Sequence, residues 1–553
     1  MSRGASIADL LVELACEELD LFHDVAGEAW VWDGTDALRV GSAAFTERLS
    51  RDFYDRTGRV ASLTSLSTAT AALRGIARWE GPEIPVGLRI ASCEGVVVVD
   101  LADAERRVVL IGPDGWEVAS ESPVRFYRPP GMQPLPLPIP GGNLEDLAEL
   151  WPVKGDDLIL VLAWVLGCFN PSGSKPVLDL SGAQGSGKSL LAKMLRSLVD
   201  PNAIPLQTMP TDLRNLAVIA AHHAVLVFDN VSQVSDELSD ALCRLASGAG
   251  FETRRLYTDD DLVTFAATRP VLLTGIPEVA KQADLVDRTT NVVLPEIGQG
   301  ERRTEAEVLA EFEAVRPRIL GVLFDAVSCA LAKSPTTVLR QAPRMLDFAT
   351  WVEAGAPALG WEKDRFLGAY LANARDSSAS VVEGSFIGQF LPQLAEAGFM
   401  GTATECLAKL GSVAGTEAIK HRGWPGTPRG LAGILRRLAP SLAEAGIVVG
   451  FDRAGHNRQR IISIHTASDP GAPDGTVLPF AKSAPAESAM VEQAAAALQA
   501  IGVDETWPPS KVAGLALLKA GGNTSVAVHA LNALGVPAPD GGPWTTDTLR
   551  GMV

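Results

Sequence analysis

Apolar residues recur at helical spacing in three parts of the first 126 residues and alternate with polar residues in three others. A period near 3.6 residues predicts an amphipathic helix, and a period of two predicts a strand with one buried face. The helical patterns cover residues 7–21, 43–56 and 66–78, and the alternating runs cover 87–90, 95–101 and 108–111. Residues 1–126 are therefore predicted to form an N-terminal α+β accessory domain, in which we identify no catalytic constellation.

A proline-rich segment follows at residues 127–142. Proline has no backbone N–H, so such a segment cannot continue a helix or a central strand. We expect a semi-rigid, extended linker here.

Strand and helix patterns alternate from residue 143 to about 300, which is typical of a largely parallel sheet covered on both faces. Residues 301–399 are predicted to be helical, with helices at 306–333 and 345–375. The next part, 400–465, is predicted as helix, helix and β-ribbon. A Gly/Pro/Asp/Ser-rich linker at 466–484 and a helical module at 485–553 complete the chain. The chain of 553 residues is thus predicted to be a multidomain α/β protein.

The clearest chemical signal is the sequence Gly-Ala-Gln-Gly-Ser-Gly-Lys-Ser at residues 182–189, which matches GxxxxGK[ST]. A predicted strand precedes it and a predicted helix follows, as a phosphate-binding loop requires. Lys188 is expected to reach the β- and γ-phosphates of ATP, and Ser189 to coordinate Mg²⁺. The predicted nucleotide-binding residues are Gly182, Ala183, Gln184, Gly185, Ser186, Gly187, Lys188 and Ser189. The alternative is a chance glycine-rich turn.

Two further strands end in polar residues that suit an ATPase. Residues 224–228 are apolar and are followed by Asp229, the candidate carboxylate for the metal. The next residue is Asn230, where many ATPases of this type carry an acid. Residues 270–273 lead to Thr274, the candidate sensor of the γ-phosphate. Asp229 could alternatively be a surface-turn residue at a strand end.

Arg288 lies where ring-forming ATPases commonly present an arginine finger to the adjacent subunit. The predicted catalytic set is therefore Lys188, Asp229, Thr274 and Arg288, with Ser189 and Asp229 at the metal. The alternative for Arg288 is a surface pair with Asp287.

Two β-prone runs flank an acidic turn within residues 253–265, a pattern that predicts a hairpin. On its first strand, Arg254 and Arg255 could contact DNA phosphates and Tyr257 could stack on a base. The three aspartates at the turn favour the alternative, a structural hairpin with solvated arginines.

The net charge of −18 argues against a surface that grips nucleic acid everywhere. Residues 420–460 reverse this charge locally, and a helix at 431–445 followed by two strands, at 447–451 and 459–464, suggests a winged helix. The predicted DNA-binding residues here are Arg429, Arg436, Arg437, Arg453 and Arg458. A winged helix that only packs on its own ATPase is the alternative.

The spacing of the cysteines and the length of the most apolar stretch indicate a cytoplasmic protein. The six cysteines stand singly, without the spacing of a disulfide framework or a zinc site. The most apolar stretch, residues 158–169, is shorter than the ~20 residues of a membrane span, so we expect a buried helix and no membrane association.

The chain resembles the helicase-like ATPases of phages, plasmids and integrated mobile elements, which are related to superfamily 3 helicases within the AAA+ class. The likeness covers about residues 150–300 and extends through 343–351. It is carried by residues 182–189, 228–231, 239–248, 251–257, 269–276 and 287–288. It implies an AAA+-like core and a homo-hexameric, ATP-driven 3′-to-5′ DNA translocase that acts in replication of an element. Thr274 departs from the Asn expected at that sensor.

A second, short resemblance involves residues 521–552, which are similar to a segment of the recombinase domain of large serine recombinases. It implies a helix-turn-helix-like DNA-binding shape and no recombination chemistry.

Three functions remain open from the sequence. The first is an ATP-dependent DNA helicase or translocase of a mobile element, with a primase or other replication proteins as possible partners. The second is a nucleotide-switched initiator or regulatory ATPase that binds DNA without unwinding it, which Asn230 and Thr274 favour. The third is a defence NTPase that senses nucleic acid.

Overall fold

The computed structural model describes most of the chain up to residue 466. The described residues are 6–144, 147, 150–249, 251–254, 262–265, 268–276, 282–298, 300, 302–421, 423–454, 459–466, 527, 528, 531, 532, 538 and 545. They belong to two compact units, Met1–Gln393 with Leu407–Ile447, and Leu394–Cys406 with Val448–Val553. Both units contain helices and strands, so the protein is a mixed α/β protein.

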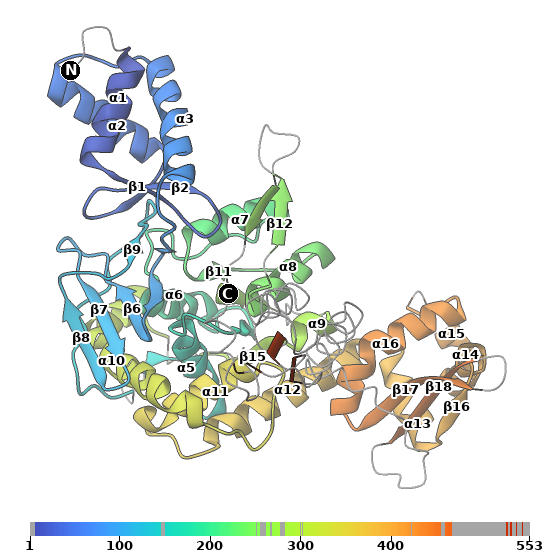
Figure 1. The fold of residues 1–553 in the computed structure, drawn as a ribbon. Coiled ribbons are helices and arrows are strands. Elements are labelled where there is room, and N and C mark those ends of the chain that lie inside the picture. Colours follow the sequence, from blue (N-terminus) through green and yellow to red (C-terminus); the bar gives the residue numbers. More distant parts are fainter. Residues whose placement is uncertain are drawn as a thin grey trace. The chain divides into compact units, whose positions relative to one another are not determined.

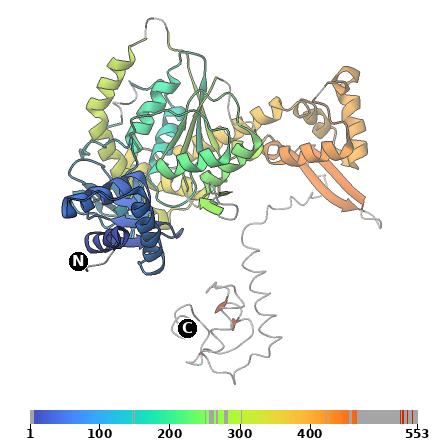
Figure 2. The same cartoon turned by 90° about the horizontal axis from the view of Figure 1, so that it is seen from above.

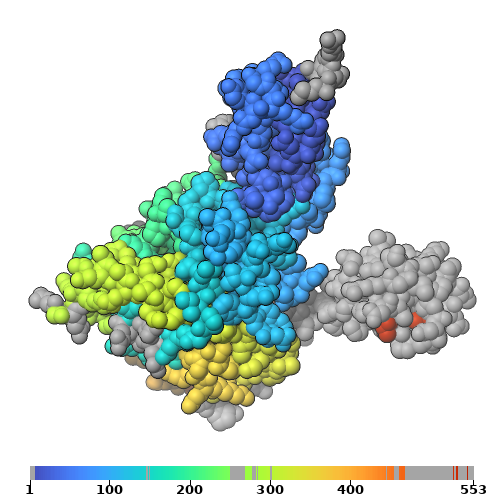
Figure 3. All heavy atoms as spheres, turned by 90° about the vertical axis from the view of Figure 1, so that its left-hand side faces the viewer, coloured from blue at the N-terminus to red at the C-terminus, as the bar shows by residue number. Residues whose placement is uncertain are grey.

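The first lobe combines three helices with a small antiparallel sheet (Figure 1; darkest blue in Figure 3). Each helix begins after a serine, Ser6, Ser42 or Ser62, whose hydroxyl accepts a hydrogen bond from the first turn. The lobe has its own core, which includes Leu11, Phe45 and Leu73. Its elements are α1 (Ile7–Glu18), α2 (Ala43–Thr57), α3 (Leu63–Trp79), β1 (Asp20–His23), β2 (Ala29–Trp32) and β3 (Ala37–Arg39).

A four-stranded antiparallel sheet follows, in the order β5-β6-β7-β8. Its strands are β5 (Ile90–Cys93), β6 (Val96–Asp100), β7 (Val108–Gly112) and β8 (Gly115–Ala119), and β4 (Val86–Gly87) pairs separately with β9 (Arg125–Phe126). The single strand predicted at 87–90 is wrong, because the chain bends between pairing with β9 and pairing with β6. Val97, Val99 and Ile111 belong to the same core as the buried residues between 159 and 294.

The proline-rich segment is extended and hydrogen-bonded to its surroundings. The N–H of Leu135 donates to Leu101 O (2.9 Å), and that of Ile139 donates to Pro317 O (2.9 Å). Leu135 is buried. The segment is therefore packed within the first compact unit.

The central feature is a four-stranded parallel sheet in the order β11-β14-β10-β15. The strands are β10 (Val177–Gly182), β11 (Leu226–Phe228), β14 (Val271–Thr274) and β15 (Thr289–Leu294). The associated helices are α5 (Asp156–Cys168), α6 (Lys188–Val199), α7 (Leu213–His222), α8 (Asp236–Ser247) and α9 (Ala283–Val286). Since all four strands run in the same direction, the residues that follow them gather at one edge of the sheet, where α/β proteins bind ligands.

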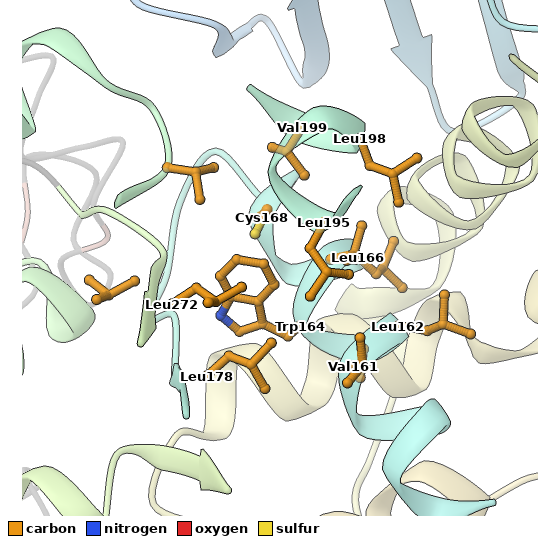
Figure 4. Close-up of a cluster of buried hydrophobic side chains, with 14 of the residues drawn as sticks. Val161, Leu162, Trp164, Leu166, Cys168, Leu178, Leu195, Leu198, Val199 and Leu272 are labelled. Carbon is orange, nitrogen blue, oxygen red and sulfur yellow. The ribbon is translucent and has the colours of Figure 1, made fainter. Parts of the chain in front are cut away.

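Helix α5 is the buried helix that the apolar stretch predicts. Residues from Ile159 to Cys168 are all buried, and Trp164 Nε1 donates to Pro176 O (2.9 Å). Figure 4 shows Trp164 among side chains of the sheet and α6, including Leu178, Leu272 and Leu195. None of the helices in the described part of the chain is both long and apolar enough to cross a membrane.

The helical region contains α10 (Glu305–Lys333), η1 (Ser334–Thr336), α11 (Leu346–Gly355), η2 (Ala356–Leu359) and α12 (Arg365–Gly384). The single helix predicted at 345–375 is wrong. Pro357 removes a backbone donor, and Gly360 (φ 72°) and Asp364 (φ 63°) adopt left-handed conformations. The chain therefore interrupts the helix between α11 and α12.

The last well-described part holds η3 (Gly388–Phe390), α13 (Leu391–Glu396), α14 (Ala403–Ala414), α15 (Thr416–Ile419) and α16 (Pro428–Glu444). The predicted two-stranded ribbon is β17 (Ile447–Ala454) and β18 (Gln459–Thr466), the orange strands of Figure 2. It gains a third strand, β16 (Phe399–Gly401), which pairs with β18. The sequence analysis did not predict β16.

Candidate nucleotide-binding site

The glycine-rich loop joins the end of the central strand β10 to the start of α6. Gly182, Gly185 and Gly187 have φ values of 144°, 84° and 84°, which other residues rarely adopt. At Gly182 a β-carbon would also lie 2.7 Å from Leu294 O. The loop conformation therefore requires glycine at positions that the motif supplies.

Lys188, the first residue of α6, folds its side chain back over this loop. Its Nζ donates to Gly182 O (2.8 Å), Ala183 O (2.7 Å) and Ser186 Oγ (3.3 Å). Partial burial lowers the pKa of the Lys188 amine, and the nearby negative charge of Asp229 opposes this shift. The ammonium group is thus held at the loop by backbone carbonyls that an anion can replace.

Asp229 directly follows β11 and receives hydrogen bonds from two other elements. Its Oδ1 accepts from Ser189 Oγ on α6 (2.8 Å) and from Thr274 Oγ1 at the end of β14 (2.6 Å). The Asn230 N–H donates to Thr274 Oγ1 (2.9 Å), and Asn230 has a φ of 54°. Ser189, Asp229 and Thr274 therefore converge at the carboxyl edge of the sheet.

This convergence offers hard oxygen donors. A carboxylate and an aliphatic hydroxyl are the protein ligands that Mg²⁺ takes beside substrate phosphates. Ser189 and Asp229 fit that role chemically, because the hydrogen bond between them shows that their side-chain oxygens are adjacent.

Arg302 was missed by the sequence analysis. Its Nη2 lies 3.7 Å from the position that a β-carbon on Gly185 would occupy, and its side chain is exposed. No motif marks this residue, which precedes α10 and reaches the loop only through the fold. Ile297 and Pro152 flank Gly187, at 3.4 and 3.7 Å from the position of a β-carbon on that residue.

Arg288 is bound within its own segment. Its Nη1 donates to Asp284 O (2.7 Å) and to Asp284 Oδ1 (2.6 Å), and 17% of its side chain is exposed. Arg344 forms ion pairs with Asp284 (3.1 Å) and Asp287 (3.4 Å). The structure thus gives Arg288 an intramolecular partner at Asp284, and a role toward a neighbouring subunit stays a prediction.

The hairpin between Asp229 and Thr274 is present as β12 (Phe251–Arg254) and β13 (Leu262–Phe265), paired antiparallel. Arg254 is the last residue of β12, and its side chain is not described. Arg255 and Tyr257 lie outside the described residues. Their contact with DNA stays a prediction.

The C-terminal basic residues are exposed where the structure describes them. Arg429, Arg436 and Arg437 lie on α16, and Arg453 lies on β17, whereas Arg458 is outside the described residues. Helix α16 belongs to the first compact unit and nearly all of β17 to the second. The winged-helix arrangement therefore stays a prediction.

Two protein-family models match consecutive parts of the chain. Residues 151–376 match the model described as "Actinomycete integrative conjugative element replication protein", and residues 387–483 match "AICE RepA C-terminal domain". Together the matches cover more than half of the chain. No curated protein matches it.

Solved structures with some similarity include the NrS-1 C-terminal region and the JCV helicase. Two apo structures of the NrS-1 C-terminal region are 10% and 12% identical, with TM-scores of 0.35 and 0.37; the matches cover 83% and 84% of this chain and 98% and 100% of those chains. The JCV helicase bound to an acetamide compound is 14% identical, with a TM-score of 0.20, 41% of this chain and 66% of that chain being covered.

None of these comparisons supports the recombinase resemblance of residues 521–552. Both family models end before that segment, and most of it lies outside the described residues.

Proposed function

Since the chain belongs to the family of replication proteins of actinomycete integrative conjugative elements, we propose that it is an ATP-driven DNA helicase or translocase of such an element. The family membership favours replication over a defence role. The observation that carries the ATPase part is the meeting of Lys188, Ser189, Asp229 and Thr274 around the glycine-rich loop.

Each residue of the site has a proposed role in binding ATP or Mg²⁺. The loop amides and the Lys188 ammonium bind the triphosphate, because backbone N–H groups at a helix N-terminus attract phosphate. Ser189 and Asp229 hold Mg²⁺, which neutralises charge on the phosphates when bound. Thr274 hydrogen-bonds both Asp229 and the Asn230 N–H, so its hydroxyl can transmit a change at the metal to the backbone after β11.

Arg288 is proposed to act on the nucleotide of a neighbouring subunit in a homo-hexamer. Because its guanidinium is bonded to Asp284, that action requires the bond to break on assembly. Arg254, Arg255 and Tyr257 of the hairpin, with the basic residues of α16 and β17, are the proposed DNA contacts.

Strand displacement on a forked DNA duplex tests this function directly. The full chain with ATP and Mg²⁺ is expected to separate the strands, and DNA is expected to stimulate its hydrolysis. Tight duplex binding with negligible DNA-stimulated hydrolysis would instead support a nucleotide-switched initiator. That second function is favoured by Asn230, which places an amide after Asp229 where a water-polarising carboxylate is common in such ATPases.

Arg302→Ala is expected to weaken ATP binding about tenfold, because a guanidinium at the loop donates charge-assisted hydrogen bonds to phosphate. Arg303→Ala is the matched control, since the neighbouring Arg303 is exposed and ion-paired with Glu311. Titration of a fluorescent ATP analogue measures both. Equal affinities for the two variants would remove Arg302 from the site.

Arg436→Ala combined with Arg437→Ala is expected to weaken DNA binding. It should also reduce the slope of log affinity against log salt concentration by about 1 to 2, because fewer phosphate contacts mean that fewer counterions are released on binding. Arg51→Ala with Arg56→Ala removes the same charge from exposed positions on α2. Fluorescence anisotropy at several salt concentrations gives the slope. An unchanged slope in the α16 variant would contradict the assignment of this helix to DNA.

A further inference from the structure

A pocket of about 330 Å³ lies at the amino edge of the parallel sheet, opposite to the edge that carries the glycine-rich loop. One wall is built by the residues that precede three strands: Lys175 before β10, Ala224 before β11 and Pro270 before β14. The other wall is the bend between β4 and β5, which contributes Arg89. We propose that this pocket is a second anion site, which binds a small phosphate-bearing molecule.

The first reason is the state of Lys175. Its side chain is 5% exposed, yet the hydrogen bond that the described residues give its amine is the one to Asn170 O (2.6 Å). An ammonium group has three N–H donors, so two remain for another acceptor. Burial lowers the pKa of Lys175 to about 8; Cys168 opposes this shift, and the positive charge of Arg269 adds to it. The negative charge of an anion in the pocket would raise this pKa and stabilise the ammonium form.

The second reason is the balance of buried charge around the pocket. Arg89 is 0% exposed and donates to Asp200 Oδ1 (3.2 Å), Asp100 O (3.0 Å) and Gln133 O (2.8 Å). Arg269 also lines the pocket and donates to Ala220 O (3.0 Å) and Thr268 O (3.1 Å). Burial lowers its pKa to about 10, which Asp200 partly opposes. Among the described residues, the carboxylate of Asp200 contacts Arg89 and opposes the pKa shift of Arg269.

The described groups next to Asp200 add positive charge to this region. Arg196 is 0% exposed and donates to the backbone oxygen of the same Asp200 (3.3 Å), which adds a further positive charge. The nearby carboxylate of Asp100 is engaged by Arg128 (2.7 Å). Buried charges are normally paired, so a local excess of positive charge beside a pocket indicates that an anion completes it.

The chemistry of the lining selects the class of anion. Arginine and lysine together are the residues that recognise phosphate oxygens. A polynucleotide needs an open groove that follows its backbone, whereas Lys175 and Arg89 are more than nine-tenths buried. The volume lies at the lower end of the range for small-molecule sites. A pyrophosphate-sized to mononucleotide-sized molecule fits these limits better than DNA.

Isothermal titration calorimetry with inorganic pyrophosphate tests the proposal. The protein is the full chain carrying Lys188→Ala, because this change weakens binding at the glycine-rich loop. We expect saturable binding of one pyrophosphate per chain. Adding Lys175→Met should weaken it at least tenfold, whereas adding Lys193→Met, at a partly exposed lysine of α6 ion-paired with Glu305, should leave it unchanged.

A second variant guards against misfolding of Lys175→Met. Ser92 is exposed and lines the same pocket, so Ser92→Glu places a competing negative charge there and should also weaken pyrophosphate binding. Absence of binding, or equal affinity with and without these changes, overturns the proposal. Displacement of pyrophosphate by single-stranded DNA also overturns it, in favour of a nucleic-acid contact. These outcomes leave the ATPase proposal untouched, because that is measured in the chain with Lys188 intact.

Discussion

Replacing Lys188 by Ala is expected to lower the rate of ATP hydrolysis by about 100-fold or more, the scale seen when one preorganised donor to a developing charge is removed. Lys188 lies over the loop with its ammonium held by the carbonyls of Gly182 and Ala183, and no neutral side chain can replace its charge at the phosphates. Strand displacement should be lost together with hydrolysis. A coupled assay of phosphate release, run beside the forked-duplex assay, measures both.

Lys193→Ala is the control for this change, because Lys193 lies on the same helix and is ion-paired with Glu305. Its hydrolysis and unwinding should match those of the unchanged chain. If Lys188→Ala retains normal hydrolysis, the glycine-rich loop is not the nucleotide site and the ATPase proposal fails.

Replacing Asp229 by Asn is expected to reduce Mg²⁺-dependent hydrolysis by about 100-fold, because an amide keeps the size of the carboxylate but loses the charge that a hard cation needs. The hydroxyls of Ser189 and Thr274 can still donate to the Asn oxygen, so the fold around the site should persist. ATP binding measured without metal should therefore change little. This separates the loss from that of Lys188→Ala, where nucleotide binding itself weakens.

Asp240→Asn, at an exposed position on α8, controls for the loss of one negative charge. Titration of hydrolysis against Mg²⁺ concentration is the decisive measurement. A full rate for Asp229→Asn at saturating Mg²⁺ would exclude Asp229 as a metal ligand.

What the sequence could determine was local. The spacing of glycines before Lys188, the helical spacing of apolar residues in α1, α2 and α3, and the apolar character of α5 act over a few residues, so each predicted its element from its own segment. The prediction of one helix at 345–375 was wrong at Pro357 and Gly360, because the helical spacing of apolar residues was given more weight than these two helix-breaking residues.

The tertiary structure decided everything that depends on strand order. Asp229 and Thr274 lie 40 and 85 residues after Ser189, and they meet it because β11, β14 and β10 run side by side in one parallel sheet. Arg302 at the loop, β16 beside β18, and the pocket formed by Lys175, Arg89 and Arg269 have no signature in the chain. The hydrophobic period and the motifs of a segment predict which element it forms. Which elements become its neighbours depends on the burial of apolar faces across the whole compact unit, and no single segment contains that information.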